Sequence, residues 1–307
     1  MSRFSLRVRL GLLAVAVVLV GGAASAQPAW RSSPLGPTVS VDAMVALGDD
    51  FEATFLSPEG LSLPGSVDLV SSALMVTARV PVGGGVSVVA DLPFSYARFT
   101  NPDVPVLGIE GGVDDDLTVG NPYVGAEAEA AGALTLGGGV RLPLSRFDRT
   151  DGFLDRGQFG QLGGFTADPE QFEAYLPEAL TVSALARYEP RVGPVGLRFM
   201  LAPAYIVDTS SDEFLNDPPR TGLALGYGAQ AEVAAGPVTL FGGVLGRPVL
   251  TGERFELFSV NAMLAAGATV TVGRVRPGVL VRLPIDRDPF PFESDATVGL
   301  SLDVPLR

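Results

Sequence analysis

The feature that most constrains the fold of this chain is the alternation of large apolar side chains with small or polar ones. In the segment 133–144, Leu and Val hold one parity, while Thr, Gly and Arg141 hold the other. A period of two places successive side chains on opposite faces of a β-strand, whereas a helix repeats every 3.6 residues. The chain is therefore predicted to be all-β. The same alternation returns at 221–233, 274–285 and 296–306.

The connections between the expected strands alternate between tight and long. Tight turns coincide with Gly, as at Gly83–Gly85 and Ala235–Gly236, while the longest connection covers 145–178. An even number of strands with short turns at one rim and long loops at the other is typical of bacterial outer-membrane barrels. We therefore predict a closed antiparallel up-and-down transmembrane β-barrel with both termini at the short-turn, periplasmic rim. Twelve strands are expected, at 38–47, 67–82, 86–99, 117–130, 133–144, 179–189, 194–208, 221–234, 237–249, 255–272, 274–285 and 296–306.

Alternation also fits a soluble β-sandwich, which buries the apolar face of each strand in a packed core. A transmembrane barrel turns that face to lipid and keeps a lumen of polar and small residues. The polar faces here combine Gly, Ala, Ser and Thr with isolated charges, and runs such as 194–208 exceed the about 5–6 residues usual for soluble strands. These features favour the barrel, and a secreted β-sandwich binding module stays as an alternative. The candidate lumen-lining charges are Asp42, Asp91, Glu127, Glu129, Arg141, Arg187, Arg198, Glu232, Arg247, Arg276, Arg282 and Asp303.

The N-terminus has the features of an export signal. Arg3, Arg7 and Arg9 precede an apolar stretch over 10–20 that is too short to span a bilayer, and Ala24–Ala26 is a small-x-small cleavage site. We therefore assign 1–26 to a cleaved secretory signal peptide and expect an outer-membrane location. The remainder divides into a periplasmic N-terminal linker at 27–37 and the barrel at 38–307.

The composition excludes several kinds of chemistry. The chain has no His and no Cys, so neither a Ser-His-Asp triad nor a Cys- or His-ligated metal site can be assembled. A net charge of −13 opposes nucleic-acid binding. Glu127 and Glu129 share one strand face, but pairing with lumen arginines is preferred over acid–base catalysis. Three acid clusters are expected at loop ends, where solvated charge is preferred over cation binding. They are Asp49-Asp50, Asp114–Asp116 and Asp286–Asp288. Taken with the points above, we expect no enzyme activity, no cofactor and no metal.

Several strands end in a charge followed by proline. Asp91, Arg141 and Arg282 each stand two residues before a Pro, and Arg247 directly precedes one. Proline lacks the amide donor of the ladder, so these prolines are expected to end strand pairing and start the outer loops. Aromatic residues cluster at the same level and predict a girdle at the membrane interface. They are Phe94, Tyr96, Phe99, Phe147 and Tyr205.

Two segments resemble a known family. The stretch from Asp114 to Gly125, DDDLTVGNPYVG, is similar to the acidic strand start of the outer-membrane "transporter" family associated with phenol-degradation gene clusters. The strand end Ala90–Phe94, ADLPF, is also similar to that family. The resemblance covers two to four strands. It implies an outer-membrane barrel for uptake of small, often hydrophobic molecules.

The C-terminus departs from that pattern. Outer-membrane barrels usually end in an aromatic residue that the insertion machinery recognises, whereas this chain ends in Leu306-Arg307. This difference concerns how the insertion machinery would recognise the barrel. The expected partners are still outer-membrane lipid and the barrel-insertion machinery.

The loop 145–178 contains Asp168-Pro169, a good helix start, and predicts a short helix near 169–175. The helix either constricts the pore or lies exposed on the loop. The expected function is a non-enzymatic channel or uptake protein for small molecules, with a closed structural or surface-display barrel as the alternative.

Overall fold

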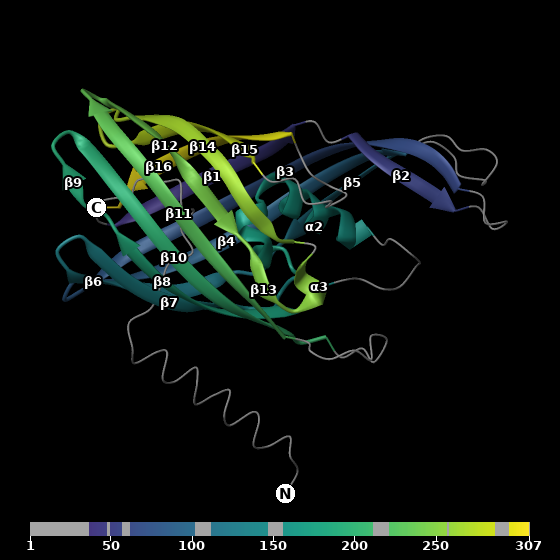
Figure 1. The fold of residues 1–307 in the computed structure, drawn as a ribbon, viewed down its shortest axis with the longest axis horizontal. Coiled ribbons are helices and arrows are strands. Elements are labelled where there is room, and N and C mark those ends of the chain that lie inside the picture. The colour runs from purple at the N-terminus through teal and green to yellow at the C-terminus, as the bar shows by residue number, and fades with distance from the viewer. Residues whose placement is uncertain are drawn as a thin grey trace, which may run out of the picture.

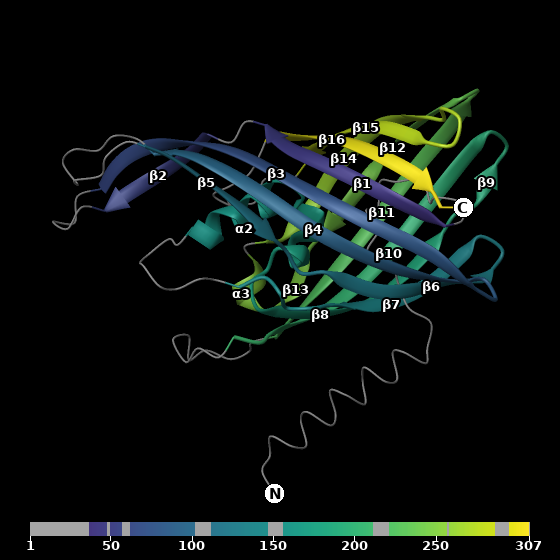
Figure 2. The same cartoon turned by 180° about the vertical axis from the view of Figure 1, so that it is seen from behind.

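The chain forms a single closed β-barrel, shown from two sides in Figures 1 and 2. No helix in the described part is both long and apolar enough to cross a membrane. Residues 1–36, which hold the predicted signal peptide and nearly all of the predicted linker, lie outside the described residues. The computed structural model describes residues 37–47, 50–56, 62–101, 112–146, 156–210, 221–256, 258–285 and 295–306.

Twelve antiparallel strands form the barrel wall. Strands that follow one another in the sequence pair as neighbours, and β1 pairs with β16 from Thr38↔Pro305 to Leu47↔Ala296, so the wall closes. Closure pairs every strand on both sides, which is the condition for crossing lipid without helices. The predicted fold class is therefore confirmed. The wall strands are β1 (Thr38–Leu47), β3 (Ser62–Gly83), β4 (Val86–Asn101), β6 (Tyr123–Ala131), β7 (Leu134–Arg141), β8 (Ala179–Tyr188), β10 (Val195–Asp208), β11 (Thr221–Ala235), β12 (Val238–Arg247), β14 (Val260–Val270), β15 (Arg276–Pro284) and β16 (Ala296–Pro305).

Four shorter strands extend the wall. β2 and β5 pair with the outer ends of β3 and β4, which reach beyond the rest of the barrel on its long-loop side (Figure 1). β9 and β13 pair with β10 and β11. None of the four was expected as a separate strand. Their bounds are β2 Asp50–Leu56, β5 Gly112–Val119, β9 Arg191–Val192 and β13 Val249–Thr251.

Two predicted strands are wrong in detail. The expected strand 117–130 breaks between β5 and β6 at 120–122, where Pro122 lacks an amide donor and the Asn121 amide bonds the carbonyl of Ala174 instead of a neighbouring strand. The expected strand 255–272 starts only at Val260, because a one-turn helix, α3 (Glu253–Glu256), occupies its first residues.

The apolar faces of the strands lie on the outside of the barrel. On β7 the side chain of Leu136 is exposed, while Thr135 and Arg141 on the other face are buried. Leu117 and Leu300 are among the most exposed apolar side chains, at 70% and 61%. A sandwich would bury these faces, so the closed barrel excludes the soluble β-sandwich alternative. An exterior of Leu and Val is the surface that a bilayer solvates.

Aromatic side chains mark two levels of the exterior. Tyr96 and Tyr205 lie towards the long-loop end, and above Tyr96 the exposed Arg98 faces Asp115 in register, where charged side chains join the apolar surface. Near the short-turn end Tyr188 and Phe199 are cross-strand partners and half exposed. This second belt was missed from the sequence, and the side chains of Phe99 and Phe147, predicted in the first, lie outside the described residues. The two levels bound the apolar band, as in outer-membrane barrels.

Candidate functional site: an arginine collar around an inserted loop

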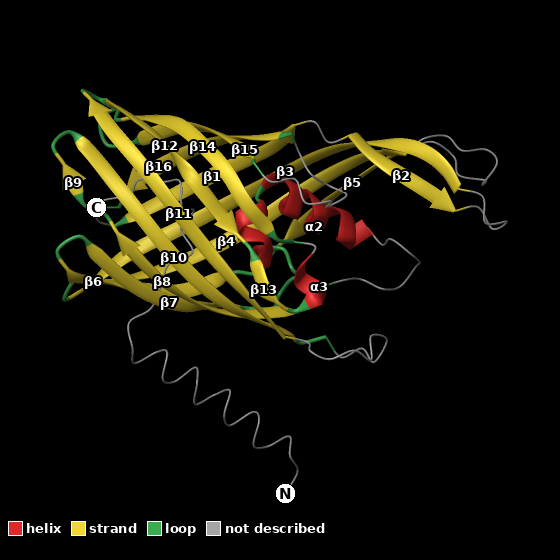
Figure 3. Cartoon of the chain, in the orientation of Figure 1, coloured by secondary structure: helices red, strands yellow, loops and turns green. Residues whose placement is uncertain are grey.

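The connection between β7 and β8 folds into the barrel. It contains α2 (Arg156–Ala167) and a 3₁₀ helix, η2 (Pro169–Ala174), which lie among the strands near the long-loop end (Figure 3). The side chains of 160–176 are buried or half-buried. The short helix predicted near 169–175 is therefore confirmed as η2, and of the two expected positions the loop takes the one inside the mouth. We call residues 156–176 the plug.

The helix α2 was missed because its sequence, RGQFGQLGGFTA, is rich in glycine, which disfavours helix. The glycines let the plug approach its surroundings closely. A Cβ at Gly163 would collide with the carbonyl oxygen of Tyr96 in β4, and one at Gly160 with the hydroxyl of Thr118 in β5. A Cβ at Gly164 would collide with the ring of Tyr175 in the plug itself. Backbone contact with the wall thus replaces side-chain packing on this face of α2.

The other side of the plug packs against apolar side chains in the lumen. Phe165 and Phe172 both contact Phe258 from the loop after α3, with ring centroids 4.4 Å and 5.9 Å apart. The same cluster includes the luminal side chains of Met44 and Met263. We expected a lumen of small and charged residues only, which is wrong for the outer half, because the plug brings its own apolar surface and needs apolar partners there.

Three arginines from the wall hold polar side chains of η2 and of Asp168, the residue that precedes it. Arg282 Nη1 lies 2.9 Å from Asp168 Oδ1, with both side chains buried. Arg247 Nε donates to Glu173 Oε1 at 2.6 Å, and Arg141 Nη2 donates to the side-chain oxygen of Gln171 at 2.7 Å. We call Arg141, Arg247 and Arg282 the collar. They are the arginines that precede Pro at the strand ends, so the repeat seen in the sequence places them together around the plug.

Asn121 fastens the end of the plug to the break between β5 and β6. Its side-chain nitrogen donates to the carbonyl of Leu176 at 2.5 Å, and its side-chain oxygen accepts from the amide of Ser145 at 2.9 Å. Its own amide donates to the carbonyl of Ala174 at 2.6 Å. Sequence reasoning missed this fully buried residue, although a Gly-Asn-Pro triplet within a strand pattern is itself a break signal.

Glu170 is the buried carboxyl of the plug that the collar does not hold. Burial raises the pKa of Glu170 to about 7; repulsion from Asp168 adds to this rise, and attraction to Arg282 opposes it. Its Oε1 atom has no hydrogen-bond partner among the described residues. Arg247 and Asp42 are the other charged groups that act on it. The docked plug therefore favours the protonated, neutral form of this side chain.

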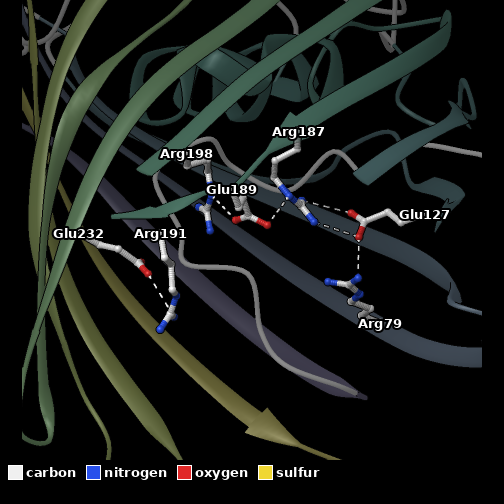
Figure 4. Close-up of polar contacts among 7 residues, drawn as sticks. All are labelled: Arg79, Glu127, Arg187, Glu189, Arg191, Arg198 and Glu232. Carbon is white, nitrogen blue, oxygen red and sulfur yellow. Dashed lines mark hydrogen bonds and ion pairs between the residues drawn. The ribbon is translucent and has the colours of Figure 1, made fainter. Parts of the chain in front are cut away.

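Towards the short-turn end the lumen holds a chain of alternating charges (Figure 4). Glu127 Oε2 lies 2.9 Å from Arg79 and 3.3 Å from Arg187. Glu189 in turn lies 3.2 Å from Arg187 and 2.7 Å from Arg198. Side chains from four strands, β3, β6, β8 and β10, and from the residue after β8 are tied together in this way. We call these five residues the charge ladder.

The ladder bears out one expectation for the acids of β6 and corrects the other. Glu127 pairs with lumen arginines as expected, namely Arg79 and Arg187, while Arg141 is engaged by the plug. Glu129 has the same parity but lies exposed at the short-turn rim. Arg79 and Glu189 were missed, since Arg79 stands in mid-strand without a neighbouring motif and Glu189 follows the end of its strand.

The remaining predicted lumen residues lie on the same inner surface. Arg276 lies 2.9 Å from Asp303, which also accepts from Ser40, and Arg191 reaches Glu232 at 3.9 Å (Figure 4). The buried Asp42 and Asp91 belong to the outer half, Asp91 lying 3.9 Å from Arg141. A cavity of about 280 Å³ opens between the ladder and the short-turn rim. We call this cavity the vestibule. The charged residues of its lining are Glu189, Arg191, Arg198, Glu232 and Arg276.

One of the acid clusters takes part in this arrangement. Asp114–Asp116 lies within β5 and not at a loop end, and the carboxylate of Asp116 accepts from the amide of Gly160 at 3.0 Å. Within the described ranges no group of three acidic side chains could hold a metal ion. The clusters at 286–288 and at Asp49 lie outside the described residues.

Known proteins resemble the chain in fold but not in sequence. No protein-family model matches it, and no curated protein matches it. An outer-membrane channel from Pseudomonas putida F1 superimposes with a TM-score of 0.52 over 91% of this chain and 99% of that channel, at 12% identity. The translocator domain of the autotransporter NalP from Neisseria meningitidis gives 0.48 at 12% identity, covering 99% and 97%. The toluene transporter TodX from Pseudomonas putida gives 0.42 at 8% identity, covering 88% and 89%.

The first of these likenesses supports the fold. At 12% identity it extends to the barrel architecture and no further. The chain therefore has the fold of an outer-membrane barrel. The association with phenol degradation that the sequence suggested stays a prediction.

Proposed function

We propose that this protein is a non-enzymatic outer-membrane channel for small solutes, whose pore is closed by the plug and opens when the plug leaves the collar. The observation that carries the proposal is how the plug is held. It contacts the wall through ion pairs, hydrogen bonds and apolar packing, as at Arg282–Asp168 and Arg247–Glu173, and by no covalent bond besides the chain itself. Such contacts can break and reform on a microsecond to second timescale.

The vestibule supports the same proposal. A barrel that serves only as a structural element needs no space under its plug, yet a cavity of about 280 Å³ lies there and is lined by charges of both signs. The likeness in fold to an outer-membrane channel is consistent with this role. The exported chain would reach the membrane through the barrel-insertion machinery, with outer-membrane lipid around its apolar band.

A closed structural barrel is the second candidate. It is favoured by the packing of Phe165 and Phe172 against Phe258, which resembles a permanent core. Planar-bilayer recordings on the purified full chain separate the two functions. Discrete conductance steps that become more frequent in Asp168→Asn support the channel. A protein that shifts in mobility when heated on a gel, and so is folded, but that stays silent in every plug variant would establish the structural barrel.

A further inference from the structure

A small cavity lies between the plug and the wall strands β7 to β12. Its volume of about 40 Å³ has room for about three water molecules. The wall contributes Arg141, Thr181, Ser183 and Arg247, and the plug contributes Glu170, Gln171 and Glu173. Two guanidinium groups and two hydroxyl groups thus face the polar side chains of the plug across a narrow space.

One half of this cavity carries polar groups whose partners are weak or absent. Arg141 and Thr181 are cross-strand partners that both point inward. Arg141 donates to the carbonyl of Asn121 and the amide oxygen of Gln171, which are neutral acceptors. Thr181 is 2% exposed, and its hydroxyl has no hydrogen-bond partner among the described residues. The carboxylate of Asp91 lies 3.9 Å from Arg141, beyond hydrogen-bond distance. A carboxylate bound in the cavity would be a stronger acceptor for Arg141 than its two neutral partners and would give Thr181 an acceptor.

The other half already holds a carboxylate. Two nitrogens of Arg247, Nε and Nη2, donate to Glu173 Oε1. Small residues make this possible, because the guanidinium lies against Gly226 and Ala202, where a larger side chain would fill its place. Glu173 therefore presents to Arg247 the group that a carboxylic acid in solution would present.

The barrel wall around the collar carries more positive than negative charge, unlike the chain as a whole. The chain carries −13, yet the collar supplies three arginines against the two wall acids Asp42 and Asp91. The plug supplies further negative charge through Asp168 and Glu173, and through Glu170 when that side chain is ionised. Once the plug withdraws, the constriction keeps an excess of positive charge, which attracts anions and repels cations.

We propose that Arg141, Arg247 and Thr181 form a binding site for small carboxylates, which Glu173 of the plug occupies in this structure as an internal competitor. The inference rests on the proposed function, because it assigns a solute class to that channel. A carboxylate that enters from the vestibule takes the place of Glu173 on Arg247 and so favours the open pore. The fork of an arginine matches the two oxygens of a carboxylate, whereas an amide of equal size offers one weaker acceptor.

Calorimetric titration of the detergent-solubilised full chain with benzoate, and with benzamide as the neutral analogue, tests the site. Glu173→Gln removes the competitor and keeps the arginine, so benzoate should bind about tenfold more tightly than to the parent chain. Arg247→Gln should abolish benzoate binding, although it breaks the same ion pair. Arg98→Gln, on the outside of the barrel, is the matched control and should bind benzoate like the parent chain.

An ion pair with a purely structural role predicts the same change for Glu173→Gln and Arg247→Gln, and that result would overturn the site. Equal binding of benzamide would overturn it too. If Arg247→Gln does not fold, Arg247→Lys keeps the charge without the fork and should weaken benzoate binding. Recordings on Glu173→Gln keep the two proposals apart. Conductance without a preference for benzoate removes only the solute class, while benzoate binding in a protein that never conducts removes only the channel.

Discussion

Arg282 and Asp168 lie 114 positions apart in the sequence, and their side chains meet at 2.9 Å inside the barrel. Both are buried, so the loss of either charge leaves the other without its partner in a medium of low dielectric constant. Removing one member of a buried pair costs about 3–5 kcal/mol. The ion pair thus couples β15 to the plug, and its loss should change the free energy with which the plug docks in the barrel.

We therefore expect Asp168→Asn to weaken docking of the plug by about 3 kcal/mol. The open probability in planar bilayers should rise, and loop 142–178 should become more sensitive to protease. Adding Arg282→Gln removes the orphaned charge, so the double variant should lie closer to the parent than the sum of the two single changes. Strict additivity would show that the two side chains act independently.

Comparing Gly163 with Gly242 tests whether a glycine is needed because the backbone approaches a neighbour closely or only because glycine is flexible. A methyl group at Gly163 would meet the Tyr96 carbonyl, whereas at Gly242 in β12 it finds ordinary contacts of 3.5 Å or more. Gly163→Ala should therefore push α2 off β4 and raise conductance, while Gly242→Ala should leave conductance unchanged. Single-channel recordings on both variants check this. Equal behaviour would mean that α2 does not need contact with the wall.

The sequence predicts the barrel well because its signal is local and repeated. Every wall strand carries alternation, and the lipid-facing residues need only be apolar, so strand positions can be read without knowing any partner. The bounds of β1 are predicted to the residue, and β8 and β16 to within one. Strand β14 is predicted to start five residues too early, because Phe255 and Phe258 read as strand but serve the core around the plug.

The site could be predicted only in part. The collar arginines were recognisable as lumen charges, since they share the polar parity of their strands. Their partners in the plug were not, because η2 has no periodic pattern that shows which of its side chains turn to the wall. Asn121 was missed for a related reason, since it acts through a contact with Leu176, 55 positions away. Glu189 was missed because it follows the end of its strand, where the alternation no longer shows which way a side chain points.

Glu127 and Glu129 test whether the ladder stabilises the barrel. Glu127 is buried between two arginines, while Glu129 lies exposed on the same strand. Glu127→Gln should lower the free energy of unfolding by about 3–5 kcal/mol. The matched change Glu129→Gln should alter it by about 0.5 kcal/mol or less. Urea unfolding in micelles measures both values, and similar losses would contradict the role given to the ladder.

The buried carboxyl of Glu170 predicts a pH dependence of docking. Its pKa is raised from 4.5 to about 7, so the docked plug binds a proton more tightly than the released plug. Its contribution to docking is complete below about pH 4.5 and is lost as the pH rises through about 7. Burial is the main cause of this raised pKa; Asp168 and Asp42 raise it further, and Arg282 and Arg247 lower it.

Open probability should therefore increase between about pH 5 and about pH 8. Glu170→Gln keeps the neutral form at every pH and should make the channel insensitive over this range. Recordings at both values on the two proteins measure the effect. A parent chain that closes as the pH rises would contradict the sign, and a Gln variant that keeps the dependence would assign it to another group.

The exposed apolar face of β16 tests what surrounds the barrel. Leu300 lies midway along the strand and is 61% exposed, while Val304 lies on the same face near the short-turn rim. An arginine at the bilayer midplane costs about 2–4 kcal/mol and near the interface about 0–1 kcal/mol. Leu300→Arg should therefore destabilise the barrel folded into lipid vesicles by that larger amount, and Val304→Arg by the smaller. Equal costs at the two depths would mean that this face does not lie across a bilayer, because water solvates an arginine equally well at both positions.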